Sequence, residues 1–139
     1  MYSFPKYKKN GNQFGPTEKK HFYIPVHYHN KSASQNERKT KWVLKQGEQY
    51  EVFRISDEGE WNCKVNKGLF SILSNGNEIL GENEERLAFF PNPQNSSDSW
   101  HGFPISSADY DISDELIKQW INAEVIDIRI SIKILKGQL

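Results

Sequence analysis

The sequence predicts an α+β domain that is mainly antiparallel β, with about seven or eight short strands and one C-terminal helix packed on the sheet. Apolar and polar residues alternate in several short segments, as in strands with one buried face. Turn-forming combinations of Asn, Asp, Lys and Gly separate those segments at short intervals. Only one segment has the caps and apolar face of a helix. A sandwich or half-barrel is the expected arrangement.

The N-terminal residues do not follow the pattern of a helix or a strand. Residues 1–18 mix Lys, Asn, Gly and Pro with isolated aromatics, so we expect an irregular basic arm there and a single globular domain over residues 19–139. The first expected strand covers residues 20–29, and Pro25 favours a place at the sheet edge because it cannot donate a ladder hydrogen bond. The residues expected on its buried face are Phe22, Ile24, Val26 and Tyr28.

The middle of the chain reads as short strands separated by turns. The turn signals are Asp57-Glu58-Gly59, Asn66-Lys67-Gly68 and Asn75-Gly76, and the last of these is the strongest hairpin signal. The polar residues 30–40 are expected to form an exposed loop. The strands expected here cover residues 42–45, 49–56, 61–65, 69–73 and 84–90.

The expected helix begins after Ser113, which is a good N-cap, and ends near Glu124. Ile112 can pack against Ile117 across this cap as a hydrophobic staple. The apolar face comprises Leu116, Ile117, Trp120 and Ile121. A final strand is expected over residues 126–134, where isoleucines alternate with polar residues.

Cysteine content and hydropathy bear on the location of the protein. Cys63 is the only cysteine, so no internal disulfide forms, and its alternation with Trp61 and Val65 predicts a buried thiol. The first residues lack the apolar stretch of a secretory signal, and no segment approaches the roughly 20 apolar residues of a membrane span. We expect a cytoplasmic protein that does not enter a membrane.

The net charge of zero hides an uneven distribution. Residues 1–46 contain ten Lys and Arg against two acids, so they carry +8 and the remaining residues carry −8. Such a chain presents a basic surface to a polyanion, or it folds so that its two parts neutralise each other. The sequence leaves both outcomes open.

Residues 1–46, which form the basic third of the chain, suggest a binding function. Lysines that contact phosphates and aromatic rings that stack on bases are typical of proteins that bind single-stranded nucleic acid. We expect a non-catalytic module that contacts nucleic acid, RNA being favoured, or a protein partner through this third. Alternatively, the acidic remainder binds a basic partner, as in an immunity protein or antitoxin-like inhibitor. The candidate nucleic-acid-binding residues are Lys6, Lys8, Lys9, Lys19, Lys20, Tyr7, Lys41 and Lys45.

The histidines suggest a different class of function. His27 and His29 lie two residues apart on an expected strand, so their rings share one face, and His101 lies in the aromatic segment 100–104. A small metal-independent ribonuclease would use His101 with His27 or His29 as acid and base. The same three residues are candidate metal ligands, although such pairs are more often ordinary surface residues. Hydrolase, thiol-redox and nucleotide-binding motifs do not occur, so we favour the binding module and expect no cofactor.

Overall fold

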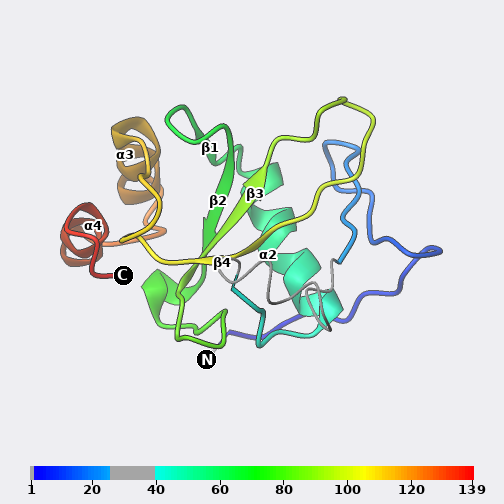
Figure 1. Ribbon diagram of the computed structural model, residues 1–139, viewed down its shortest axis with the longest axis horizontal. Coiled ribbons are helices and arrows are strands. Elements are labelled where there is room, and N and C mark those ends of the chain that lie inside the picture. Colours follow the sequence, from blue (N-terminus) through cyan, green and yellow to red (C-terminus); the bar gives the residue numbers. More distant parts are fainter. Residues whose placement is uncertain (1, 26–39) are drawn as a thin grey trace.

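The computed structural model describes residues 2–25 and 40–139. Within them the fold is α+β, with one antiparallel sheet in the order β1-β2-β3-β4 (Figure 1). The strands are β1 (Asn62–Cys63), β2 (Gly68–Ile72), β3 (Leu87–Pro91) and β4 (Phe103–Ile105). The helices are α2 (Gln46–Glu58), α3 (Asp114–Asn122) and α4 (Ile128–Leu135), with a short 3-10 helix at Ser74–Gly76. The expected seven or eight strands and single helix are therefore corrected to four strands and three α-helices in this part of the chain.

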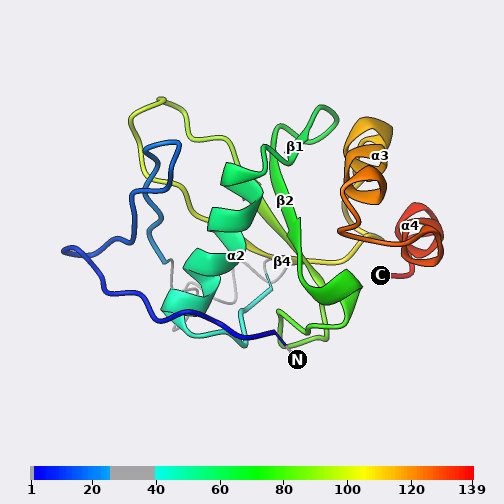
Figure 2. The same cartoon turned by 180° about the vertical axis from the view of Figure 1, so that it is seen from behind.

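The sheet is the middle layer of three. Helix α2 covers one face, and α3 and α4 lie on the other side (Figures 1 and 2). Phe70 and Phe89, which are paired across β2 and β3, belong to the core beneath α3 and α4. Leu69 and Phe90, the neighbouring pair, belong to the core beneath α2. Because both faces are covered, every residue of β2 is buried. Residues 2–25 and 40–139 therefore form neither a sandwich of two sheets nor a half-barrel.

Segment 49–56 is part of helix α2, so the predicted strand there is wrong. Apolar residues at helical spacing, such as Tyr50 and Phe53, face the sheet and are 3% and 0% exposed. Arg54 forms ion pairs with Glu51 and Glu58, three and four residues away, which are distances that suit a helix. The predicted strand at 42–45 is also absent, since its Trp42 forms only an isolated bridge.

Segment 126–134 contains helix α4 where a strand was predicted. Ile126, Ile130 and Ile134 are each 4% exposed, whereas Ile128 and Ile132 are 59% and 45% exposed. Residues that alternate with a period of two also recur every four residues, and every fourth residue lies on one face of a helix. Asp127 then acts as the N-cap, because its side chain accepts a hydrogen bond from the backbone N–H of Ile130.

The segment predicted as the first strand is extended at its start but faces the other way. Tyr23 is completely buried, whereas Phe22 and Ile24 are only half-buried. Tyr23 forms isolated bridges to Phe14 and Trp100 rather than a continuous ladder. The remainder of this predicted strand lies outside the described residues.

The local turn and cap signals had different outcomes. Ser113 caps α3 as predicted, with its side chain accepting from the N–H of Leu116. Asn75 and Gly76 have φ values of 55° and 81°, but they belong to the 3-10 helix, and β3 starts only at Leu87. A longer connection therefore replaces the predicted tight hairpin. None of the helices in residues 2–25 and 40–139 has the length and apolar character needed to cross a membrane.

Candidate functional site

The lysines that the sequence singles out stay at the surface after folding. Lys19 forms an ion pair with Glu60 at 3.1 Å, the one such pair of these lysines within residues 2–25 and 40–139. Both side chains are exposed, so the pair adds little to stability. The positive charges are thus accessible to solvent. The exposed lysines are Lys6, Lys8, Lys9, Lys19, Lys20, Lys41 and Lys45.

Aromatic side chains hold the N-terminal segment against α2 (Figure 2). Phe14 is 3% exposed and stacks on Tyr50 with a ring-centroid distance of 5.6 Å. The ring of Tyr7 packs edge-on against the same Tyr50 at 4.7 Å. The backbone that carries Lys6, Lys8 and Lys9 is therefore fixed by its own neighbouring side chains.

A buried carboxylate on α2 completes this attachment. Glu51 is 2% exposed and accepts hydrogen bonds from the hydroxyls of Tyr2 and Tyr7 and from Nε and Nη2 of Arg54, at 2.8 and 3.1 Å. Burial alone would raise the pKa of Glu51, but the hydrogen bonds from Arg54, Tyr2 and Tyr7 outweigh it and lower the pKa. Burial and the bond to Glu51 raise the pKa of Tyr7. Glu51 thus stays charged, and its negative charge is bound by Tyr2, Tyr7 and Arg54 inside the fold.

A second buried carboxylate fixes the segment at the C-terminal end of α2. Asp57 is 4% exposed and accepts a hydrogen bond from the hydroxyl of Thr17 at 2.6 Å. His21 Nδ1 lies 2.9 Å from the other oxygen of Asp57, and the His21 ring lies beside Trp100. Asp57 therefore contacts the Nδ1 side of the His21 ring, and Nε2 is the ring's other nitrogen. The His21 side chain is 31% exposed.

Lys6 and Lys45 meet at a hollow beside the start of α2. The hollow has a volume of about 390 Å³. Lys45 is the N-cap residue of α2, so the positive end of the helix dipole lies near both lysines. Glu48 also lines the hollow, but its Oε1 accepts from the Lys45 N–H at 2.9 Å and so serves to start the helix. The lining residues are Phe4, Pro5, Lys6, Tyr7, Lys45, Gly47 and Glu48.

The two ends of α2 differ in their surface charge. At the C-terminal end, Lys19 pairs with Glu60, and the Glu18 N–H donates to Glu58 at 3.1 Å, which brings several carboxylates to the same region. At the N-terminal end, Lys6 and Lys45 face the single carboxylate of Glu48. The excess of positive charge is therefore greater at the N-terminal end of α2 than at its C-terminal end.

The other predicted site residues do not gather with these lysines. Tyr7 is half-buried, with its hydroxyl bonded to Glu51, so its ring does not offer a free stacking surface. His101 is exposed and lies between Trp100 and β4. His27 and His29 lie outside the described residues. Within residues 2–25 and 40–139, no three His, Cys, Asp or Glu side chains are grouped to hold a metal ion.

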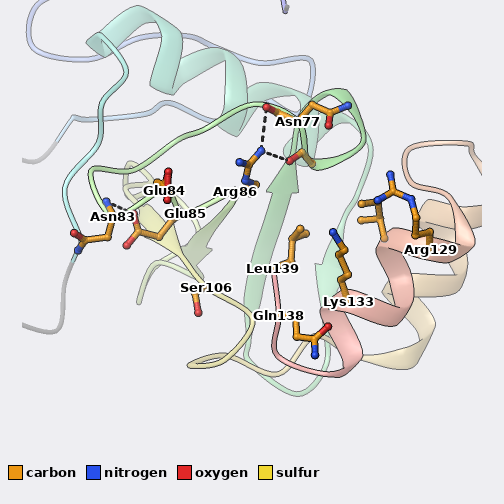
Figure 3. Close-up of a pocket in the computed structure, with 12 residues that line it drawn as sticks. Asn77, Asn83, Glu84, Glu85, Arg86, Ser106, Arg129, Lys133, Gln138 and Leu139 are labelled. Atoms are coloured by element: carbon orange, nitrogen blue, oxygen red, sulfur yellow. Dashed lines mark hydrogen bonds between the residues drawn. The ribbon is translucent and has the colours of Figure 1, made fainter.

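A second hollow, of about 460 Å³, separates α4 from the connection between β2 and β3 (Figure 3). Arg129 and Lys133 project from α4, and Arg86 Nη1 donates to the carbonyls of Gly76 and Asn77 at 3.0 and 3.2 Å. Glu84 and Glu85 line the same hollow. Because it is lined by carboxylates on one side and by the cations of α4 on the other, its charge does not favour one class of ligand.

Sequence reasoning missed the residues that hold the site in place. The sequence places Glu51 in a predicted strand and Asp57 in a predicted turn, and His21 is not among its candidate acid–base residues. The spacing of Glu51, Arg54 and Glu58 was the available signal, since charges three and four residues apart indicate a helix face. Their partners Tyr2, Tyr7, Thr17 and His21 are distant in sequence, so no local pattern reveals them.

Comparisons with known proteins identify no relative of this chain. No family model, no curated protein and no solved structure matches this chain.

Proposed function

We propose that this protein is a non-catalytic binding module that contacts single-stranded RNA through the basic surface at the N-terminal end of α2. The observation that carries the proposal is the convergence of Lys6 and Lys45 on one hollow, which Phe4 also lines. Lysine ammonium groups contact phosphates, and an aromatic ring stacks on an unpaired base. A hollow of about 390 Å³ is within the size range of small-ligand pockets, so one nucleotide is a reasonable occupant.

The state of the two buried carboxylates of α2 supports the availability of this surface. Glu51 and Asp57 are buried and hydrogen-bonded to tyrosine, threonine, histidine and arginine side chains. They therefore do not neutralise the exposed lysines. Lys6 and Lys45 are exposed and lie beside the N-terminal end of α2, where the positive end of the helix dipole also favours an anion.

Charge reversal tests the proposal better than deletion of the N-terminal residues. Removing residues 1–20 would also remove Phe14 from the core, so a loss of binding would not be informative. We expect Lys6→Glu/Lys45→Glu to weaken binding of a fluorescein-labelled oligouridine at least about tenfold, because phosphate contacts become repulsive. Fluorescence anisotropy measures the affinity.

The matched control reverses two exposed cations elsewhere. Lys118→Glu/Lys136→Glu changes the net charge by the same amount, on α3 and next to α4. We expect a smaller effect on affinity from this pair, and circular dichroism checks that both variants fold. Equal losses in the two variants would show that only net charge matters, and no binding by the wild type would exclude RNA as the ligand.

A metal-independent ribonuclease is the second candidate, and the arrangement of His21 favours it. A buried carboxylate that holds Nδ1 of a histidine leaves Nε2 to exchange a proton with a substrate, as in many acid–base catalysts. This proposal replaces the predicted use of His101 with His27 or His29. His21→Ala would abolish cleavage of a labelled RNA while leaving binding in place. If purified wild type does not cleave RNA, or the variant cleaves it equally well, the enzyme candidate fails.

A further inference from the structure

Helix α4 carries an apolar stripe on its outer surface. Ile128, Ile132 and Leu135 are 59%, 45% and 62% exposed, which is unusual for large aliphatic side chains grouped on one helix. With about 100° of rotation per residue, the three lie within a sector of about 60°. The helix lies at the edge of the molecule beyond α3 (Figure 1), and its opposite face packs into the core through Ile130 and Ile134.

Basic side chains border this stripe on one side only. Arg129, Lys133 and Lys136 follow the apolar residues around the helix, and none of them forms an ion pair within residues 2–25 and 40–139. A hollow of about 430 Å³ adjoins Ile128, lined by Ile121 and Ile126 and bordered by Glu124 and Asp127. The surface thus combines an apolar strip, a recess with an apolar lining and an acidic rim, and a flank of cations. Two of these cations, Arg129 and Lys133, also line the hollow in Figure 3, where Glu84 and Glu85 lie on the opposite side.

We propose that the outer face of α4 binds an acidic amphipathic helix of a partner protein. The partner's apolar side chains cover Ile128, Ile132 and Leu135, one of them enters the recess, and its carboxylates face Arg129, Lys133 and Lys136. This is the helix-in-groove mode of peptide recognition, in which apolar anchors recur every three or four residues. The proposal does not depend on the RNA-binding function proposed above, because α4 and the start of α2 lie on opposite sides of the sheet.

Two other occupants fit the charge pattern less well. An anionic membrane would meet the carboxylates of Glu124 and Asp127, which are exposed at the rim of the recess. A second copy of this chain, paired through α4 about a two-fold axis with the helices antiparallel, would place the basic flank of one helix against the basic flank of the other. Both arrangements bring like charges together, whereas a helix that is acidic only on the flank facing Arg129, Lys133 and Lys136 places an apolar side chain, and no carboxylate, at the recess.

A designed peptide pair tests the proposal. The probe is a fluorescein-labelled helical peptide with a leucine stripe and glutamates along the flank that would face the cations, and its control has lysines in place of the glutamates. We expect the acidic peptide to bind at least about tenfold more tightly than the basic one, by electrostatic complementarity. Ile132→Asp should reduce binding of the acidic peptide at least about tenfold, since it places a charge at the centre of the apolar contact.

Val65→Asp is the matched control, because Val65 is also an exposed aliphatic residue, at 60%, but lies far from α4 in the turn between β1 and β2. It should leave peptide binding unchanged. Equal binding of the two peptides, or equal effects of the two variants, would overturn the proposal. Two other results would also overturn it: a wild-type dimer in sedimentation velocity that Ile132→Asp abolishes, or wild-type binding to phosphatidylserine vesicles that Ile132→Asp abolishes. In the first case the face would bind a second copy of the chain, and in the second it would bind a membrane.

Discussion

Replacement of Glu51 by glutamine tests how the N-terminal segment is held on α2. The carboxylate accepts hydrogen bonds from Tyr2, Tyr7 and two nitrogens of Arg54 while being 2% exposed. Glutamine keeps the shape but removes the negative charge, and its amide group adds donors where the neighbours already donate. Hydrogen bonds to a charged group contribute about 1.5–3 kcal/mol each, and Arg54 retains some contact with solvent, so we expect a loss of roughly 2–4 kcal/mol.

Urea denaturation at several pH values measures this loss. The hydrogen bonds lower the pKa of Glu51 below its ordinary value of 4.5, so the charged carboxylate stabilises the folded state above that pH. The difference between wild type and Glu51→Gln should be constant near neutral pH and should shrink as the pH falls below about 4.5 toward the lowered pKa. Glu60→Gln is the control, because Glu60 is 66% exposed and its pair with Lys19 should contribute less than about 1 kcal/mol.

A Glu51→Gln variant as stable as wild type would refute this reasoning. A difference that stays the same down to low pH would also refute it, because the effect would then come from shape and not from charge.

Three further predictions concern the fold and are checked by thermal unfolding. Ile130→Ala should cost about 2–5 kcal/mol, whereas Ile132→Ala should cost less than about 1 kcal/mol, and equal costs would contradict the helical arrangement of α4. Ser113→Ala should cost about 1 kcal/mol by removing the cap of α3, and no change would show that the cap is dispensable. Gly102→Ala should destabilise by at least about 1–3 kcal/mol, because a Cβ there would lie 2.2 Å from the Phe90 ring. Gly47→Ala in α2 should instead stabilise slightly, because a Cβ there meets nothing closer than 3.8 Å. A Gly102→Ala variant more stable than Gly47→Ala would contradict the packing.

The elements that could be predicted are those with strong local signals. Helix α3 has a capping serine, acidic residues in its first turn and an apolar face, all within one short segment. The turn signal before Gly68 is also local, and β2 begins at Gly68, directly after it. Local interactions decide these structures, so the sequence pattern is sufficient for them.

The elements that were wrongly predicted depend on contacts between distant residues. In α4, the alternating isoleucines fit a strand and a helix equally well, and packing against the sheet and α3 selects the helix. In α2, Tyr50 and Phe53 gain their burial from Phe14, Tyr23 and Phe90, which lie far away in the sequence. Tertiary packing overrides local propensity in both cases.

The candidate site was predictable in its charge but not in its geometry. The uneven distribution of lysines is visible in the sequence, and the described lysines are exposed. The convergence of Lys6 with Lys45, and the anchoring of the segment by Glu51 and Asp57, require that residues 2–20 lie along α2. No sequence period encodes that contact.

The most direct test of the RNA-binding proposal is the salt dependence of RNA affinity. For single strands, each neutralised phosphate contributes about −0.7 to the slope of log K against log salt concentration. We predict a clearly negative slope for the wild type, and a slope shallower by about 1.4 for Lys6→Gln/Lys45→Gln, as expected for two lost phosphate contacts. A slope near zero, or one that is the same in the two proteins, would contradict the claim that these lysines bind the RNA backbone.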